Sequence, residues 1–408
     1  MGNFKYPKGS EWRKWDLHIH TPFSYLNNQF GNDFNQYVKN LFKKALEKEF
    51  VAIGITDYFS IDGYKKLKNE YLQRNESLGN LGFSEDEIKQ IKQILILPNI
   101  ELRLNKLVGS DRINFHVIFS DKVNIDDVEE NFLREIKFVY QGGPQTEDEK
   151  RSLSLQNLMD LGKKLKNEHD EFKKMSEIEV GMMNAVVDDT EIMKILSNKK
   201  SIFEGKYLTF VPADEDLSQI SWNSQDHNVR KVIVQKSDGF FSSNQGTREF
   251  GLGKKHSSVV EFINEFKTLK PCIWGSDAKK CEKLFEPDLK RYTWIKADPT
   301  FEGLKQIIYE PEERVYVGEE PPSKIERNKI IKSITISNSH NWFEDKTLPL
   351  NEGLVSIIGG KGTGKTAILN LIAYATKSYK CYEYNDIKST SFLQKAFKEL
   401  KGTNIKIE

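Results

Sequence analysis

One stretch of the sequence, LVSIIGGKGTGKTAILNLIAYAT at 354–376, restricts the fold more than any other. Its apolar beginning, Leu354–Ile358, predicts a buried strand, and Ala367–Ala375 predicts a helix. The G-x-x-x-x-G-K-[ST] motif between them turns the backbone so that its N–H groups and the start of the helix face a phosphate. We expect Lys365 to reach the β- and γ-phosphates of ATP and Thr366 to bind Mg²⁺. The candidate nucleotide-binding residues are Gly359, Gly360, Lys361, Gly362, Thr363, Gly364, Lys365 and Thr366.

Composition and charge exclude several classes of protein. The chain has 408 residues, enough for two or three domains, and its hydrophobic and charged contents of 38% and 30% are ordinary for a globular protein. A net charge of +1 gives no overall field that favours nucleic acid, although a neutral total does not exclude a local basic groove. The three cysteines lack C-x-x-C spacing, which indicates reduced thiols. Because no apolar run could span a bilayer or serve as a signal core, we expect a cytoplasmic protein with no membrane partner.

Short apolar segments that end at polar residues recur along most of the chain, with helical patterns between some of them. The expected strands are Lys14–His20, Val51–Thr56, Ile94–Leu97, Ile113–Ser120, Tyr207–Val211, Pro271–Trp274 and Tyr292–Ala297. The expected helices are Tyr37–Phe50, Ile88–Gln93 behind a capping box at 84–87, Leu153–Lys166 and Glu191–Leu196. This alternation predicts an α/β fold with a largely parallel sheet, and the polar strand ends predict a barrel-like domain with its site at that rim.

Two domains are expected from this pattern. The first spans residues 10–325 and contains a helical insertion at about 141–206, where the sequence is long and polar. Pro321–Pro322 marks the boundary. The second domain spans 326–408, with Ile330–Ile336 and Leu354–Ile358 as its early strands.

A histidine pair stands at the end of the first expected strand, in the sequence WDLHIH at 15–20. Side chains two residues apart share one face of a strand, so Asp16, His18 and His20 should point the same way. Two imidazoles so placed can chelate one metal ion, or they can be hydrogen-bonded at a polar rim. His169, His227, His256 and His340 stand in polar or helical contexts and are expected at the surface.

Further acids and a histidine stand at or near the ends of separate strands: Asp57, Glu101, His116 and Asp277. Carboxylates together with imidazoles suit Zn²⁺, Mn²⁺ or iron, and such an ion can bind a phosphate and lower the pKa of a water molecule. Arg103 lies two residues after Glu101 and could hold a phosphate oxygen as a fork or form a salt bridge. Together with His18 and His20, these residues form the candidate metal site.

These motifs resemble the PHP (polymerase and histidinol phosphatase) family of metal-dependent phosphoesterases. The resemblance runs through DLHIHT at 16–21, ITD at 55–57, Glu101, His116 and GSDA at 275–278. With the downstream P-loop, the whole chain is similar to the N-terminal part of TrlF-type proteins. The resemblance implies a distorted (β/α)7 barrel, followed by the N-terminal part of an SMC/ABC-like P-loop ATPase domain. It also implies metal roles for His18, His20, Asp57, Glu101, His116 and Asp277.

Two positions depart from the family pattern. Tyr58 and Lys279 stand where PHP enzymes usually have metal-binding histidines. We therefore expect one or two ions rather than three. Lys279 could replace the charge of a metal ion and bind phosphate directly. Arg103, Lys279 and Tyr58 are the candidate catalytic residues outside the metal site.

The leading hypothesis is a phosphoesterase, and more narrowly a nuclease, that depends on a metal ion and is coupled to ATP binding, in DNA processing or phage defence. The alternative is a nucleotide-dependent binding or scaffold module with a degenerate barrel. An amidohydrolase is disfavoured, since no later pair of histidines stands at a strand end. No Walker B pattern follows Thr366, so another polypeptide or further C-terminal sequence is expected to complete the ATPase head. The other expected partners are nucleic acid and further copies of the chain.

Overall fold

The computed structural model describes residues 8–108, 111–140, 143, 150–213, 226–322, 330–339, 343–377, 395–396, 398 and 400–408. The chain divides into two compact units. The larger unit is Trp12–Pro321, and the smaller unit combines Met1–Glu11 with Pro322–Glu408. None of the helices in the described part of the chain is both long and apolar enough to cross a membrane.

The larger unit is built around one mixed sheet, with its strands in the order β10-β9-β8-β4-β3-β2-β1-β11-β12. These strands are β1 Trp12–His20, β2 Phe50–Tyr58, β3 Leu95–Val108, β4 Asp111–Phe119, β8 Tyr207–Pro212, β9 Gly239–Phe241, β10 Cys272–Ile273, β11 Tyr292–Lys296 and β12 Val315–Gly318. Three short strands extend from β3, namely β5 Lys137–Val139, β6 Arg151–Ser152 and β7 Val186–Val187. Every strand predicted for this unit is present, whereas β5, β6, β7, β9 and β12 were not predicted.

The expectation of a largely parallel sheet is wrong. β1, β2 and β3 run parallel, and so do β8, β9 and β10. However, β3–β4, β4–β8, β1–β11 and β11–β12 are antiparallel. Only residues 109–110 connect β3 to β4. A parallel crossover needs about a dozen residues or more, so this connection forces an antiparallel pair.

The sheet curls back on itself at β1, which gives the expected barrel-like α/β fold. β11 pairs with the beginning of β1, between Trp12 and Trp15. Nearer its end, β1 is met by the segment that follows β10, where Ile19 bridges to Ala278 in the parallel direction and the His20 N–H donates to the Ala278 carbonyl at 3.1 Å. The loop after β10 is thereby held against the end of β1.

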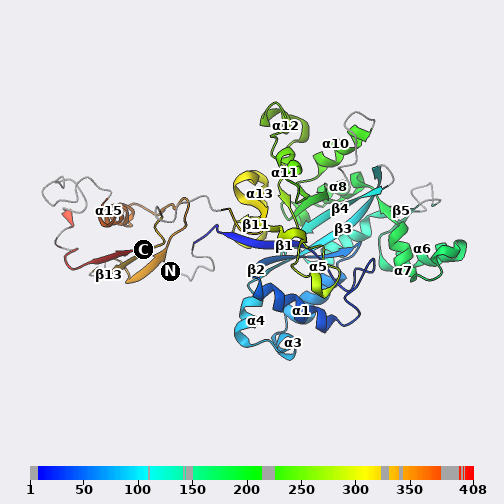
Figure 1. The fold of residues 1–408 in the computed structure, drawn as a ribbon, viewed down its shortest axis with the longest axis horizontal. Helices are drawn as coiled ribbons and strands as arrows, with labels where there is room; N and C mark the ends of the chain where they lie inside the picture. The colour runs from blue at the N-terminus through cyan, green and yellow to red at the C-terminus, as the bar shows by residue number, and fades with distance from the viewer. Residues whose placement is uncertain are drawn as a thin grey trace. The chain divides into compact units, whose positions relative to one another are not determined.

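Helices cover the sheet on its two sides, as Figure 1 shows. Those labelled α1, α3 and α4 lie on one side, and α11, α12 and α13 lie on the other. The helices of this unit outside the insertion are α1 Phe34–Glu47, α2 Asp62–Lys66, α3 Asn75–Asn80, α4 Glu85–Ile91, α5 Ile125–Asn131, α10 Asp226–Lys236, α11 Gln245–Gly251, α12 Val259–Phe266, α13 Phe301–Tyr309 and α14 Pro311–Arg314.

Local sequence signals explain where two of these helices begin. The Asp33 side chain accepts a hydrogen bond from the Gln36 N–H and caps α1, whose predicted apolar stripe is buried. The predicted capping box before α4 is present, with Ser84 and Glu87 each bonded to the backbone of the other. Apolar side chains of the strands, such as Leu17 in β1, share one buried cluster with Phe301 and Leu304 of α13.

The segment expected as a helical insertion contains α6 Leu155–Glu168, α7 Glu177–Asn184, α8 Asp189–Asn198 and α9 Lys200–Phe203, together with β6 and β7. Helices α6 and α7 pack closely because both have glycine at their crossing. A Cβ on Gly162 would lie 1.7 Å from the Glu177 carbonyl oxygen, and one on Gly181 would lie 1.9 Å from that of Leu158. Any larger side chain at either position would separate the two helices.

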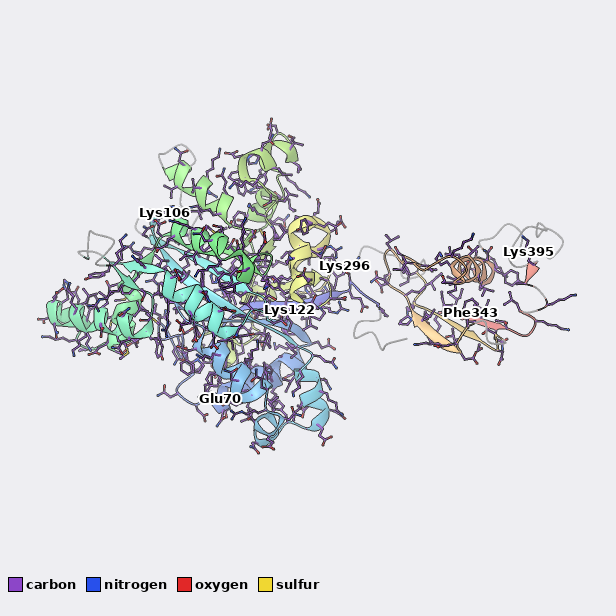
Figure 2. All side chains as sticks on the ribbon, turned by 180° about the vertical axis from the view of Figure 1, so that it is seen from behind. Glu70, Lys106, Lys122, Lys296, Phe343 and Lys395 are labelled. Carbon is purple, nitrogen blue, oxygen red and sulfur yellow. The ribbon has the colours of Figure 1, made fainter. Side chains whose placement is uncertain are left out.

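The described residues of the smaller unit form a three-stranded antiparallel sheet and the helix α15. Its elements are β13 Ser333–Ser337, β14 Lys346–Pro349, β15 Asn404–Ile407 and α15 Lys365–Ala375. Leu371 of α15 packs on Ile334 and Ile336 of β13, and Phe343, labelled in Figure 2, lies against this core. Here the sheet buries one face against the helix.

The prediction of a buried strand at Leu354–Ile358 is wrong. These residues form no strand with any described neighbour, and the side chains of Leu354 and Ile358 are each 90% exposed. A strand needs a partner for its backbone groups, and β13 already has β14 and β15 on its two edges. The apolar pattern is real, but the described part of the chain supplies no strand to pair with it.

Candidate metal centre

Three potential metal-binding side chains converge on one point in the larger unit. The Nε2 atoms of His18 and His20, at the end of β1, are 3.2 Å apart. The Glu101 Oε2 atom, from β3, lies 3.3 Å from the first and 3.5 Å from the second. The three side chains are close enough to hold one metal ion.

Asp277 adds a fourth donor atom from the loop after β10. Its Oδ1 atom lies 3.3 Å from His18 Nε2 and 3.0 Å from His20 Nε2. Four ligands held tetrahedrally at zinc-to-ligand lengths of about 2.0–2.1 Å are about 3.3 Å apart. The separations among His18, His20 and Glu101 match this spacing, so these three donors fit one ion, and Asp277 lies next to both imidazoles.

The tautomer of His20 is fixed by its other ring nitrogen. His20 Nδ1 lies 2.8 Å from the Ser24 hydroxyl, which lies 2.9 Å from Asp57 Oδ1 and 3.1 Å from the Thr56 carbonyl. Both of these oxygens are acceptors, so the hydroxyl donates its proton to one of them and accepts from His20 Nδ1. His20 Nε2 is therefore left with a free lone pair that faces the cluster.

His116 presents another free lone pair beside the cluster. Its Nδ1 atom is 3.3 Å from Asn99 Oδ1, while the Asn99 amide nitrogen donates to the Leu17 carbonyl and to Thr56. The proton of His116 is thus on Nδ1, and its buried Nε2 atom has no hydrogen-bond partner among the described residues. His116 is paired with Glu101 across β3 and β4, and its ring centroid is 4.7 Å from that of His18. A buried, unpartnered imidazole nitrogen next to three other donors is what a metal ion would satisfy.

Asp57 lies outside the cluster, although the sequence resemblance implied a metal role for it. Its Oδ1 atom accepts from Thr21 at 2.7 Å and from Ser24, and its Oδ2 atom accepts from the Gly63 N–H at 2.9 Å. Burial raises the pKa of Asp57 to about 7. Its position orients His20 through Ser24 and does not bring a carboxylate oxygen to the ion.

The loop that carries Asp277 is fastened tightly to β1. The Asp16 carboxylate accepts hydrogen bonds from the backbone N–H groups of His18 and Ser276, each at 3.2 Å. Gly275 allows this approach, since a Cβ there would lie 2.6 Å from the His18 Cβ atom. Asp277 itself has a φ of 45°, in the left-handed region that aspartate tolerates better than most residues.

The charges of the cluster favour metal binding. Burial lowers the pKa of His116 to about 3 and also lowers that of His20, so both imidazoles are neutral, as ligands must be. Burial opposes ionisation of Glu101, but the three imidazoles around it bring its pKa down to about 2. Burial also opposes ionisation of Asp277, yet His18, His20 and Lys279 hold its pKa well below the usual range. For His18, the two carboxylates outweigh burial and raise the pKa.

The three candidate catalytic residues differ in their placement. The Lys279 ammonium lies 2.6 Å from Asp277 Oδ2, on the side of the carboxylate away from the imidazoles. The Tyr58 ring is buried, with its centroid 4.8 Å from that of His20. Arg103 donates instead to the Met183 carbonyl of α7 at 2.9 Å. Lys279 is thus the cation placed beside the candidate metal ligands.

The glycine-rich loop of the smaller unit has a folded-back lysine. Gly362 and Gly364 have φ values of 86° and 85°, which glycine adopts without strain. The Lys365 ammonium donates to the carbonyls of Gly359 and Gly360 at 2.8 and 2.6 Å. In this position it covers the loop, and a bound nucleotide would have to draw it away from these carbonyls.

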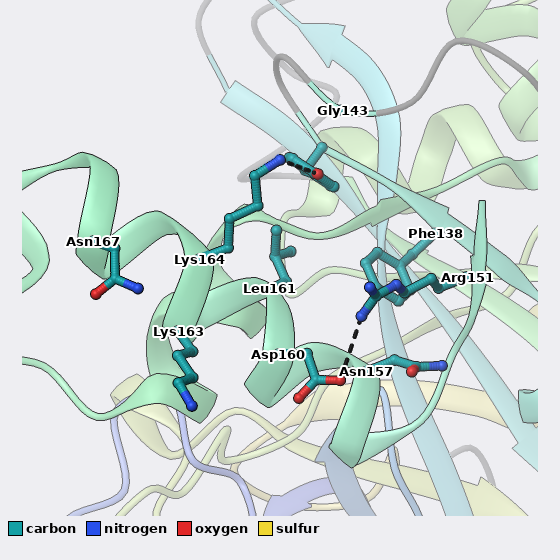
Figure 3. Close-up of a pocket in the computed structure, with 10 residues that line it drawn as sticks. Phe138, Gly143, Arg151, Asn157, Asp160, Leu161, Lys163, Lys164 and Asn167 are labelled. Atoms are coloured by element: carbon teal, nitrogen blue, oxygen red, sulfur yellow. Dashed lines mark hydrogen bonds and ion pairs between the residues drawn. The ribbon is translucent and has the colours of Figure 1, made fainter. Parts of the chain in front are cut away.

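The remaining histidines are not part of the cluster. His169 is exposed, as expected, but His256 is half-buried against phenylalanines and lies 3.4 Å from Glu265. His340 and the side chain of His227 fall outside the described residues. A cavity of about 750 Å³ lies in the insertion, where Figure 3 shows Arg151 paired with Asp160 and Lys164 bonded towards Tyr140. None of the candidate site residues lines it.

Sequence reasoning missed Ser24 and Asn99, the residues that set the tautomers of His20 and His116. Ser24 follows His20 by four residues and Asn99 precedes Glu101 by two, yet small polar residues at such spacings are common in turns and strands. No signal in a single sequence distinguishes them from ordinary capping or turn residues.

Comparison with known proteins gave two findings. An AAA domain family model matches residues 333–407, which include the glycine-rich loop. A crystal structure of a candidate metal-dependent phosphoesterase from Bifidobacterium adolescentis is similar, with a TM-score of 0.35 and 13% sequence identity over 74% of this chain and 97% of that chain. No match was found among curated proteins. This structural similarity is too low to support an argument about the fold or the site. Both are therefore described from the strands, helices and distances given above.

Proposed function

We propose that the larger unit is a metal-dependent phosphoesterase, and more narrowly a nuclease, whose activity is coupled to nucleotide bound by residues 359–366. One observation carries the proposal: donor atoms of His18, His20 and Glu101, from two strands far apart in sequence, lie close enough to hold one metal ion, and Asp277 reaches both imidazoles from a third part of the chain. The motifs at these positions resemble those of PHP phosphoesterases.

The ion and the residues around it would have different roles in phosphoester hydrolysis. A bound Zn²⁺ or Mn²⁺ ion would polarise a phosphate oxygen and supply hydroxide at neutral pH. Asp277 would hold the ion through Oδ1 and the Lys279 ammonium through Oδ2. Lys279 is then placed to bind a phosphate oxygen next to the ion and to offset the charge that develops on it.

The nucleotide would act through the smaller unit. Lys365 would exchange the carbonyls of Gly359 and Gly360 for ATP phosphates, and Thr366 would hold Mg²⁺. We propose that further sequence or another polypeptide completes the ATPase head, that ATP joins two copies of the chain, and that the role is DNA processing or phage defence.

The test begins with elemental analysis of the purified protein, followed by hydrolysis of chromogenic mono- and diesters, DNA and RNA, with and without ATP. His20→Ala should lose both the bound metal and the activity, because it removes a central donor. The matched control is His169→Ala, which removes an exposed histidine and should change neither. Metal content that is the same in His20→Ala and the parent would contradict the assigned site.

A binding module with an inactive barrel is the second candidate, and Tyr58 and Lys279 favour it. An ammonium 2.6 Å from Asp277 competes with a cation for the same carboxylate. This candidate predicts a protein that binds nucleotide normally, retains little metal after dialysis and cleaves no phosphoester.

A further inference from the structure

A small polar cavity opens directly beside the candidate metal centre. Its volume is about 290 Å³, near the lower end for pockets that bury a small ligand. Asp277 and Gly275 belong to its wall, so the cavity shares a carboxylate with the metal cluster. The other lining residues are Gln29, Trp274, Ser276, Lys279, Lys280, Lys283 and Asp288.

Three lysines give this wall a positive character. Lys279 is held on Asp277, whose charge would be shared with a bound cation. Lys283 is paired with Asp288 at 3.0 Å, and both are exposed to solvent. Lys280 is exposed, and its ammonium has no ion pair among the described residues. An ion at the metal centre would share the charge of Asp277, and Asp288 is the other acidic residue among those that line the cavity.

A buried donor in the same wall lacks an acceptor. The indole Nε1 atom of Trp274 is buried and makes no hydrogen bond with any described residue. An indole N–H can only donate, and a buried donor without a partner is costly. This nitrogen is not exposed to the cavity, so the indole can contribute an aromatic surface to a ligand but not a hydrogen bond. The half-buried Trp274 indole gives the wall this aromatic surface.

We infer that this lysine pocket, formed by Trp274, Lys279, Lys280 and Lys283, holds a phosphate of a single nucleic-acid strand next to the one that is cleaved. This rests on the proposed function, because the scissile phosphate is placed by the metal centre. Lysines that follow a backbone beside an aromatic side chain are the usual means of holding a single strand. An isolated phosphomonoester would occupy Lys279 and leave Lys280 and Lys283 without a role.

The test measures binding of a fluorescein-labelled, phosphorothioate-linked oligothymidine, which keeps its charge and resists hydrolysis, to the metal-loaded full chain. The variant is Lys280→Ala/Lys283→Ala, and the matched control is Lys174→Ala/Lys194→Ala, two exposed lysines that do not line the pocket. The pocket variant should bind about tenfold more weakly, and the slope of log K against log salt should be less steep by about 1.4, or 0.7 for each lost phosphate contact. The control should bind like the parent.

Equal affinities of the pocket variant and the parent would overturn the inference, and so would a metal-loaded parent that does not bind the strand. If inorganic tripolyphosphate binds with the same dependence on Lys280 and Lys283 while the strand does not, the occupant is a small polyphosphate and the inference is wrong. Failure of the proposed function is seen separately, as a parent protein without metal or without hydrolysis of any phosphoester.

Discussion

Gly275→Ala should disturb the metal centre although it replaces none of the candidate metal ligands. The new Cβ atom would lie 2.6 Å from the His18 Cβ atom and 2.9 Å from Asp16 Oδ1, whereas carbon atoms in contact are about 3.5–4.0 Å apart. The loop must therefore move by about 1 Å, which carries Asp277 Oδ1 from 3.0 Å to about 4 Å from His20 Nε2. We expect metal affinity to fall about 10–100-fold and folding stability to fall by about 1–3 kcal/mol.

Competition with a chromophoric chelator would measure the affinity, and urea unfolding of the metal-free protein would measure the stability. The control is Gly79→Ala in α3, where a Cβ meets nothing within 4 Å and the backbone is not left-handed. This change should leave metal affinity alone and stabilise the protein by about 0.4–1 kcal/mol. If Gly275→Ala kept the affinity of the parent, close packing of the loop on β1 would not be what places Asp277.

Three further predictions concern other parts of the chain. Ser24→Ala should lower metal affinity about 10–100-fold in the same competition assay, because His20 Nδ1 loses its hydrogen-bond acceptor. An unchanged affinity would show that Ser24 is not needed to fix the tautomer of His20. Burial lowers the pKa of Lys270 from its usual 10.5 to about 8, so the folded protein releases this proton before the unfolded chain does. The stability of the parent relative to Lys270→Met should therefore rise by about 1.4 kcal/mol per pH unit between pH 8 and 10.5, and a constant difference in urea unfolding would refute this. Lys365→Ala should weaken ATP binding by about 10–100-fold in titration calorimetry, because a charge-assisted bond to phosphate is lost, and full affinity would exclude the glycine-rich loop as the site.

The strands and the histidine pair could be predicted because each depends on residues close together in sequence. The alternation in β1 places His18 and His20 together, and every other expected strand of the larger unit is found. The sheet direction could not be predicted, since it depends on which strands are neighbours. The same limit explains the error at Leu354–Ile358, where an apolar run shows what could be buried but not whether a partner strand is present.

The site was harder to predict than the fold at the level of individual atoms. Asp57 and Glu101 both follow apolar segments, yet only Glu101 points to the imidazoles, while Asp57 turns to Thr21 and Ser24. The difference arises from side-chain partners far away in sequence. A single sequence indicates which acidic residues lie near the ends of the strands. Only the structure distinguishes an acid that can bind the metal ion from one that orients a metal-binding histidine.

The chain passes from the smaller unit into the larger one and back again. The Asn351 amide donates to the carbonyls of Lys8 and Ser10, each at 2.8 Å, and β1 begins at Trp12, so the strand with the imidazole pair starts two residues after a segment that is hydrogen-bonded within the smaller unit. For protein engineering, the smaller unit cannot be excised at one position, and separating the two requires two cuts and a new peptide join between Glu11 and Pro322.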